Sequence, residues 1–160
     1  MEKIHNEWVD HPKYNCFGCS PTNPMGLHME FMEDGDDIVS QWTPNHNTQG
    51  WIDVLHGGIQ ATLADEIASW VVFRKLGTTG VTSRMELRYM HEVSNLAPYI
   101  TLRAHLTAHR HRLADIEVLI EDAEGRLCTR MQCTYFLASA DEARKAGFRP
   151  FRLECETQQN

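Results

Sequence analysis

The chain has 160 residues, of which 42% are hydrophobic and 23% are charged, and its formal net charge is −7 at pH 7. This length suits a single domain over residues 1–160, with a core at about 16–138 and flanking ends. The acidic balance argues against nucleic-acid binding, no apolar run reaches the about 18 residues of a membrane span, and the lack of a secretory signal pattern indicates a cytoplasmic protein.

Five cysteines occur, an odd number without the spacing of a secreted disulfide framework, so we expect reduced thiols. Cys16 and Cys19 form a Cys-x-x-Cys motif. With His11 or His28 this pair could bind zinc, but no second pair follows at zinc-ribbon spacing. We therefore expect a turn that packs the N-terminal segment on the end of a barrel-like sheet, with no metal and no other cofactor.

Two alternating segments flank a turn near the start of the chain. The alternating apolar positions are Leu27, Met29 and Phe31 before the turn at 34–36, and Ile38, Ser40 and Trp42 after it. Alternation on both sides of a Gly-containing turn predicts a β-hairpin.

The segment 56–76 is predicted to form a helix of about five turns. Apolar residues cover most of its circumference: Ile59, Leu63, Ile67 and Trp70 on one stripe, and Ala61, Ala64, Ala68 and Val72 on much of the far side. A helix of this kind is surrounded by other elements instead of lying on a surface.

Four further strands are predicted at 81–92, 100–108, 116–120 and 127–137, separated by a break at 95–98 and a turn at 122–125. From residue 139 onward the pattern indicates a short exposed helix and a loose polar end. One helix followed by long antiparallel strands predicts an α+β class with the helix packed on the sheet.

Asp65 and two glycines make this helix the candidate site. Asp65 projects among small residues as a partly desolvated carboxylate, which is either a general base or a structural hydrogen-bonding group. Gly57 and Gly58 begin the helix, where free backbone N–H groups can hold an oxyanion. An ordinary glycine-rich helix entry is the alternative.

Gly58 and Asp65 lie on the order of 10 Å apart along the helix axis, since the rise is about 1.5 Å per residue. One small reacting group cannot contact both. If the two act together, the amide and the carboxylate come from different chains, which predicts a homodimer with sites across its two-fold axis.

Several short motifs occur together: Asn23-Pro24-Met25-Gly26-Leu27, His46-Asn47-Thr48-Gln49-Gly50, Leu55-His56-Gly57-Gly58, Ala64-Asp65-Glu66 and Gly80-Val81-Thr82. With them, the chain from about 16 to 137 resembles the hotdog-fold acyl-CoA thioesterases of the phenylacetate-pathway type. The resemblance implies a hotdog fold, in which an antiparallel sheet wraps a long central helix. It also implies an acyl-CoA substrate and a homodimer or dimer of dimers with shared active sites.

Site residues follow from the matching motif positions. The resemblance implies that Asp65 is the catalytic carboxylate, which activates water or attacks the thioester carbon directly. Gly57, with Gly58, matches the backbone N–H that polarises the thioester carbonyl, and His56 matches a histidine that shapes the loop. Thr82 matches a hydroxyl that assists the water or the acid.

The strand pattern favours a different hydroxyl. Strict alternation through Val81, Ser83 and Met85 places Ser83, not Thr82, on the helix-facing side. A bulge at the start of the strand would restore Thr82 to that side. Both hydroxyls remain candidates.

The chain departs from simpler members of that family before the histidine, because the longer segment 51–55 follows Gly50. We therefore prefer Gln49 to Asn47 for a polar contact with the substrate, with an ordinary turn residue as the alternative.

Three charged residues have open roles. Glu66 competes with Asp65, and only the resemblance ranks Asp65 first. Arg110 and Arg112, at the tip of a predicted hairpin, could hold coenzyme A phosphates through charge-assisted hydrogen bonds or lie in solvent.

The sequence thus predicts hydrolysis of an acyl-CoA thioester. A hotdog hydratase or dehydratase and a non-catalytic acyl-CoA-binding module are the alternatives. The first would add or remove water without releasing thiol, and the second would bind acyl-CoA without turnover.

Overall fold

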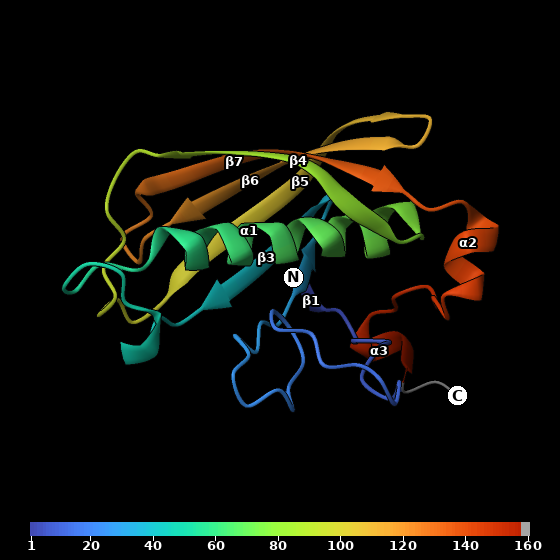
Figure 1. Ribbon diagram of the computed structural model, residues 1–160, viewed down its shortest axis with the longest axis horizontal. Coiled ribbons are helices and arrows are strands. Elements are labelled where there is room, and N and C mark those ends of the chain that lie inside the picture. The colour runs from blue at the N-terminus through green and yellow to red at the C-terminus, as the bar shows by residue number, and fades with distance from the viewer. Residues whose placement is uncertain (158–160) are drawn as a thin grey trace.

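A seven-stranded antiparallel sheet with one long helix across its face forms the structure, which is a computed structural model describing residues 1–157 (Figure 1). The strands are β1 (Glu2–Lys3), β2 (Met32–Asp34), β3 (Asp37–Trp42), β4 (Gly80–Tyr89), β5 (Ile100–Arg110), β6 (Leu113–Glu121) and β7 (Leu127–Leu137), in the spatial order β1-β2-β3-β5-β6-β7-β4. The predicted α+β arrangement is confirmed.

The helices are a 3₁₀ turn η1 (His46–Thr48), the long α1 (Gly57–Val71), a π-helical turn η2 (Val72–Leu76), α2 (Ala140–Lys145) and α3 (Glu154–Thr157). α1 and η2 together cover the predicted helix 56–76. Gly77, at φ 61°, ends them in the left-handed conformation that glycine tolerates. No helix within residues 1–157 is long and apolar enough to span a membrane.

The core lies between α1 and the central strands. The fully buried Leu63 and Ile67 of α1 face a sheet surface that includes Leu102, Ile116 and Met131. Burying a leucine or isoleucine side chain contributes about 1.5–3 kcal/mol. This packing fixes the rotation of α1 and therefore the directions in which its two acidic residues point.

The predicted early hairpin is confirmed from Met32 onward, but residues 27–31 do not belong to a strand. Their alternating burial is real, because Leu27 and Phe31 are buried. Their backbone, however, bonds an N-terminal loop: the Leu27 N–H donates to the Phe17 carbonyl at 2.7 Å and the Met29 N–H donates to the Gly18 carbonyl at 2.9 Å. An alternating pattern does not reveal which backbone accepts its hydrogen bonds.

β4 is an edge strand. It pairs with β7, and within residues 1–157 no strand pairs with its other edge. Val81 is 67% exposed and Tyr89 is 51% exposed along this strand. A ten-residue edge with exposed apolar side chains is a surface that a partner strand can cover.

Candidate active site

Asp65 is held by two hydroxyl groups from neighbouring strands. The Thr82 Oγ1 hydroxyl donates to Asp65 Oδ1 at 2.6 Å, and the Tyr135 hydroxyl donates its hydrogen between the same oxygen and the Asp65 backbone carbonyl, each at 2.8 Å. No hydrogen bond to Asp65 Oδ2 is found among residues 1–157. The carboxylate is therefore fixed through one oxygen, while the other remains available to a proton or an electrophile.

A β-bulge explains why Thr82 and not Ser83 faces α1. Thr82 pairs with Tyr135, whereas Arg84 pairs with the preceding residue Thr134, so Ser83 is the extra residue. The Ser83 hydroxyl donates instead to the Thr134 carbonyl at 2.9 Å. The strict alternation was wrong for Ser83, because a bulge shifts the phase of the side chains.

Tyr135 has no role in the sequence prediction, although it lies on the helix-facing side of β7. Burial, followed by the charge of Asp65, raises the pKa of Tyr135 well above its usual value, so the phenol keeps its proton and donates. The same two causes raise the pKa of Cys133 to about 12, and its thiol stays neutral. The half-buried Asp65 therefore has neutral, buried groups on its β7 side and the exposed Thr82 on its β4 side.

The start of α1 presents one free amide where two were expected. The Gly58 N–H donates to His56 Nδ1 at 2.8 Å, so the histidine side chain caps the helix. A ring nitrogen that accepts carries no proton, and the proton of a neutral His56 lies on Nε2. The Gly57 N–H makes no hydrogen bond among residues 1–157.

The Gly57 carbonyl is tied to the far end of β4. The Tyr89 hydroxyl donates to it at 2.9 Å. Thr82, near the start of β4, contacts Asp65, so the strand runs alongside α1 from the carboxylate to the helix start. Both candidate groups therefore lie on the seam between α1 and β4.

A buried glutamine supports the helix start and was not predicted from the sequence. The Gln60 side chain donates to the Leu55 carbonyl at 3.3 Å and accepts from the Thr129 hydroxyl at 2.6 Å. A polar residue within an apolar helix pattern was the only sequence signal. These bonds hold the turn before α1 against β7.

The longer loop before His56 folds back on itself. The Gly50 N–H donates to the Val54 carbonyl at 2.9 Å, and the His56 N–H donates to the Thr48 carbonyl at 2.9 Å. A Cβ atom at Gly50 would lie 2.9 Å from His56 Cα, so glycine is required for this close approach. The loop therefore remains next to the helix start despite its length.

Asn47 and Gln49 lie in this loop region. Asn47 is exposed within η1, where its N–H donates to Asn45 Oδ1 at 2.9 Å. Gln49 is half-buried and forms a backbone bridge with Leu55. Gln49 is thus paired with a residue two positions before α1, whereas Asn47 is not. A contact of either side chain with the substrate stays a prediction.

Glu66 lies apart from Asp65, although the two are adjacent in sequence. Its carboxylate contacts the Cys16 thiol and accepts from Trp70 Nε1 at 3.3 Å. Burial, followed by the charge of Cys16, raises the pKa of Glu66 to about 7. Within one chain, Glu66 therefore belongs to a different cluster from the one around Asp65.

Arg110 is the last residue of β5, and Arg112 lies in the turn before β6. Arg110 pairs with Asp115, whereas Arg112 pairs with Glu142 and stacks on the Phe136 ring at 4.6 Å. Phe136 follows the helix-facing Tyr135 in β7, so the alternation of side chains along the strand places the Phe136 ring on the face of the sheet away from α1. Neither arginine reaches the Asp65 cluster of its own chain, and contact with coenzyme A phosphates stays a prediction.

Comparison with known proteins agrees with this architecture. Residues 53–129 match the family model described as the Thioesterase superfamily. No curated protein matches the chain. A solved structure of a thioesterase superfamily protein is 21% identical, with a TM-score of 0.66 over 72% of this chain. The chain spans 56% of the length of that protein.

Two other solved structures match over more of their own length. A thioesterase from Haemophilus influenzae is 24% identical, with a TM-score of 0.64 over 71% of this chain and 80% of that protein. A hypothetical thioesterase from Streptococcus pneumoniae, solved with coenzyme A, is 24% identical, with a TM-score of 0.64 over 69% of this chain and 86% of that protein. The order of the strands and the position of the long helix, together with these likenesses, show that the chain has the hotdog fold of thioesterase-superfamily proteins.

Proposed function

We propose that the protein hydrolyses an acyl-CoA thioester to a free acid and coenzyme A, at sites shared between two subunits. The observation that carries the proposal is a pair of groups between α1 and β4: an Asp65 oxygen and the Gly57 N–H, neither of which has a hydrogen-bond partner within residues 1–157. One group suits proton removal and the other suits stabilisation of an oxyanion.

A single chain cannot bring these groups together. At a rise of about 1.5 Å per residue, the eight positions from Gly57 to Asp65 cover roughly 12 Å along α1. A thioester carbonyl bound at Gly57 is therefore out of reach of the same chain's Asp65.

Antiparallel pairing of two β4 edges removes this separation. On β4, Thr82 is the residue that contacts Asp65, and Tyr89 is the residue that contacts Gly57. A two-fold axis between Met85 and Glu86, halfway between these markers, places Thr82 beside the partner subunit's Tyr89. Asp65 then faces the partner subunit's Gly57, and the exposed apolar edge of β4 is covered. Association of two such dimers into a tetramer is a further expectation.

The chemistry follows from this arrangement. The Gly57 N–H donates to the thioester carbonyl oxygen, while Asp65 Oδ2 removes a proton from water. The water oxygen bonds to the carbonyl carbon, the carbon–sulfur bond breaks, and the proton passes to the leaving sulfur. Direct attack by Asp65 on the carbon, through an anhydride that water then cleaves, is the second route open to this carboxylate. Thr82 and Tyr135 orient the carboxylate in both routes.

Coenzyme A as the carrier is supported by two structural relatives. One is the Streptococcus pneumoniae hypothetical thioesterase with coenzyme A. Another, a protein from Streptococcus mutans bound to acetyl-CoA, is 14% identical with a TM-score of 0.63. We therefore take acyl-CoA as the substrate class.

Thiol release from a panel of acyl-CoA substrates tests the proposal. We expect turnover by the wild type and a loss of about 10²–10⁴-fold in kcat for Asp65→Asn, because acid–base assistance is typically of that size. Asp36→Asn, in an exposed turn, is the matched control and retains wild-type turnover.

Other outcomes would replace the proposal. Hydration of a crotonyl-type thioester without thiol release would identify a hydratase. Binding of acyl-CoA by the wild type without turnover of any substrate would identify a binding module.

A further inference from the structure

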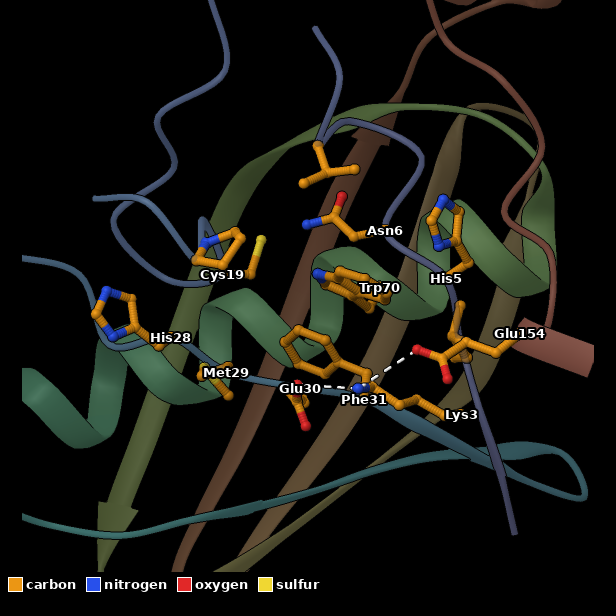
Figure 2. Close-up of a pocket in the computed structure, with 13 residues that line it drawn as sticks. Lys3, His5, Asn6, Cys19, His28, Met29, Glu30, Phe31, Trp70 and Glu154 are labelled. Atoms are coloured by element: carbon orange, nitrogen blue, oxygen red, sulfur yellow. Dashed lines mark hydrogen bonds and ion pairs between the residues drawn. The ribbon is translucent and has the colours of Figure 1, made fainter. Parts of the chain in front are cut away.

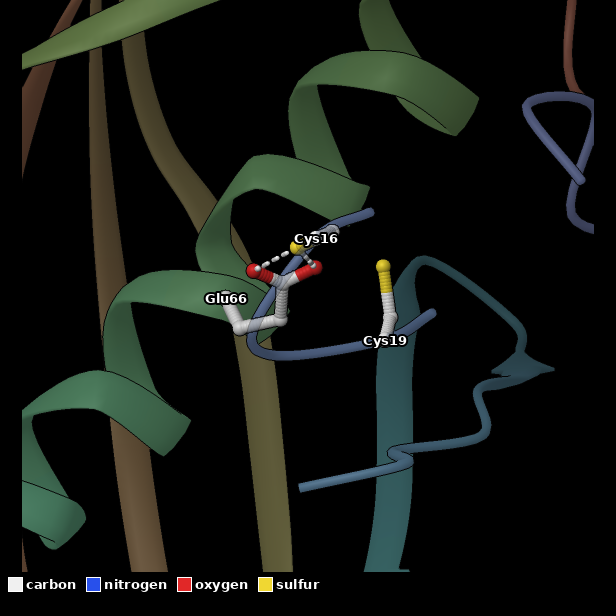
Figure 3. Close-up of side chains that lie close together, drawn as sticks. All are labelled: Cys16, Cys19 and Glu66. Atoms are coloured by element: carbon white, nitrogen blue, oxygen red, sulfur yellow. Dashed lines mark hydrogen bonds between the residues drawn. The ribbon is translucent and has the colours of Figure 1, made fainter. Parts of the chain in front are cut away.

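Cys16, Cys19 and Glu66 bring three potential metal ligands together from two distant segments. One ligand atom from each residue, the two sulfurs and a carboxylate oxygen, lies within 4.8 Å of the other two (Figure 3). The Cys16 sulfur is 3.5 Å from Glu66 Oε1 and 3.4 Å from Oε2, although 50 residues separate Cys16 and Glu66 in sequence. The carboxylate of α1 thus points directly at the Cys-x-x-Cys turn.

The surroundings of this cluster supply neutral donors. The Gly18 N–H donates to the Cys16 sulfur at 3.3 Å, the Tyr14 hydroxyl lies 2.9 Å from the Cys19 sulfur, and Trp70 Nε1 donates to Glu66. Among residues 1–157, no lysine, arginine or histidine forms a hydrogen bond or ion pair with these three ligand residues. Once the two thiols have lost their protons, a bound cation would offset the charge of the thiolates and the carboxylate.

The turn is shaped around the carboxylate. A Cβ atom at Gly18 would lie 2.4 Å from the Glu66 carboxyl carbon and from Oε2, so any other residue would displace the carboxylate from the turn. The bonds from Leu27 and Met29 to the turn hold its other side. The Glu66 carboxylate therefore occupies space that is free only because residue 18 is a glycine.

We propose that Cys16, Cys19 and Glu66 bind one zinc ion, which fastens the N-terminal segment to α1. Sulfur and carboxylate ligands suit zinc. Tetrahedral bonds of about 2.3 Å to sulfur and about 2.0 Å to oxygen place those atoms about 3.5 Å apart, as the Cys16 sulfur and Glu66 oxygens are. Three protein ligands leave one position for a water molecule.

A cavity adjoins the cluster at one of its three ligands, Cys19. Its volume is about 310 Å³, and Cys19 and Trp70 line it (Figure 2). His28 lies on the cavity wall, but its Nε2 is 2.6 Å from the Asn23 carbonyl and outside the cluster. In this proposal Glu66 takes the ligand position considered for a histidine, and the proposed zinc ion departs from the expectation of a turn without metal.

Metal binding by the whole chain tests the site directly. Under reducing conditions, zinc added to metal-free wild type should bind at one ion per chain. Cobalt in its place should give the sulfur-to-metal charge-transfer band of a thiolate site. Removing the metal with a chelator should lower the melting temperature.

Matched variants separate this site from general thiol binding. Loss of a residue that only supports a metal ligand typically lowers metal affinity by about 10–100-fold. We expect a larger loss of zinc affinity in each ligand variant: Cys16→Ser, Cys19→Ser and Glu66→Gln. Cys155→Ser removes an exposed cysteine outside the cluster and should bind zinc like the wild type. Circular dichroism of each metal-free variant checks that the fold is kept.

Two results would overturn the proposal. One is a reduced wild type that binds no stoichiometric zinc and gives no charge-transfer band with cobalt. The other is undiminished zinc binding by the folded Glu66→Gln variant, which would leave the carboxylate outside the site.

Discussion

Replacing Gly57 by proline would remove one backbone N–H with little other change. Gly57 is the first residue of α1, the helix position at which proline is best tolerated. His56, with φ −59° and ψ 130°, already has the conformation that a residue before proline adopts. A Cβ atom at position 57 would contact the Tyr89 ring at 3.5 Å, an ordinary van der Waals distance.

The expected effect on catalysis is large. Removal of one oxyanion donor typically lowers kcat by about 10²–10³-fold, equivalent to about 2.7–4 kcal/mol of transition-state stabilisation. Gly57→Ala keeps the N–H while adding the same Cβ atom, so it should retain most of the activity. Thiol release at saturating and limiting acyl-CoA gives kcat and KM for both variants, and melting temperatures confirm that each is folded.

A close match between the two variants would refute this reasoning. If folded Gly57→Pro had the kcat of Gly57→Ala, the Gly57 N–H would not stabilise the reacting carbonyl.

Thr82→Val and Tyr135→Phe should each lower kcat by roughly 10–100-fold, because each loses a hydrogen bond to a charged group; Ser83→Ala should not, and an equal loss in that variant would contradict the assignment of the bulge. Burial favours a raised pKa for Glu33, but the hydrogen bonds and charges of Arg74 and Lys75 outweigh it and hold its pKa below the usual 4.5. This group therefore stabilises the fold above its unfolded pKa and loses that contribution as pH falls through its folded pKa. Denaturant unfolding should show Glu33→Gln less stable than wild type at neutral pH, with the gap closing on acidification; a gap independent of pH would contradict this. Ser40→Ala should raise the free energy of unfolding by up to about 1 kcal/mol, because the buried Ser40 hydroxyl has no partner within residues 1–157; a loss of stability would show that the hydroxyl is satisfied.

The fold was largely predictable because its signals are local. The apolar positions of α1 recur at helical spacing, and those of β5 to β7 alternate, so each element could be recognised without its neighbours. Residues 27–31 were misassigned because their hydrogen-bond acceptors lie in the loop around Phe17. Which segment pairs with which is a tertiary property that alternation does not carry.

The site residues that belong to a local sequence motif were predictable, whereas those whose position depends on strand pairing or on contacts between distant segments were not. Asp65 and Gly57 came from local motifs. The choice of Thr82 over Ser83 depended on a bulge, which is defined by the register with β7. The loss of the Gly58 N–H to His56 depended on one side-chain rotamer, and the meeting of Glu66 with Cys16 depended on how the N-terminal loop crosses α1.

Co-expression of Asp65→Asn chains with Gly57→Pro chains tests the shared site most directly. Each homodimer lacks one essential group at both sites, whereas a mixed dimer has one site with both defects and one intact site. With random pairing, half of the dimers are mixed, so the mixture should recover about one quarter of wild-type thiol release. Activity no higher than that of the two parent variants would place both groups in one chain or outside the reaction, and would contradict the account.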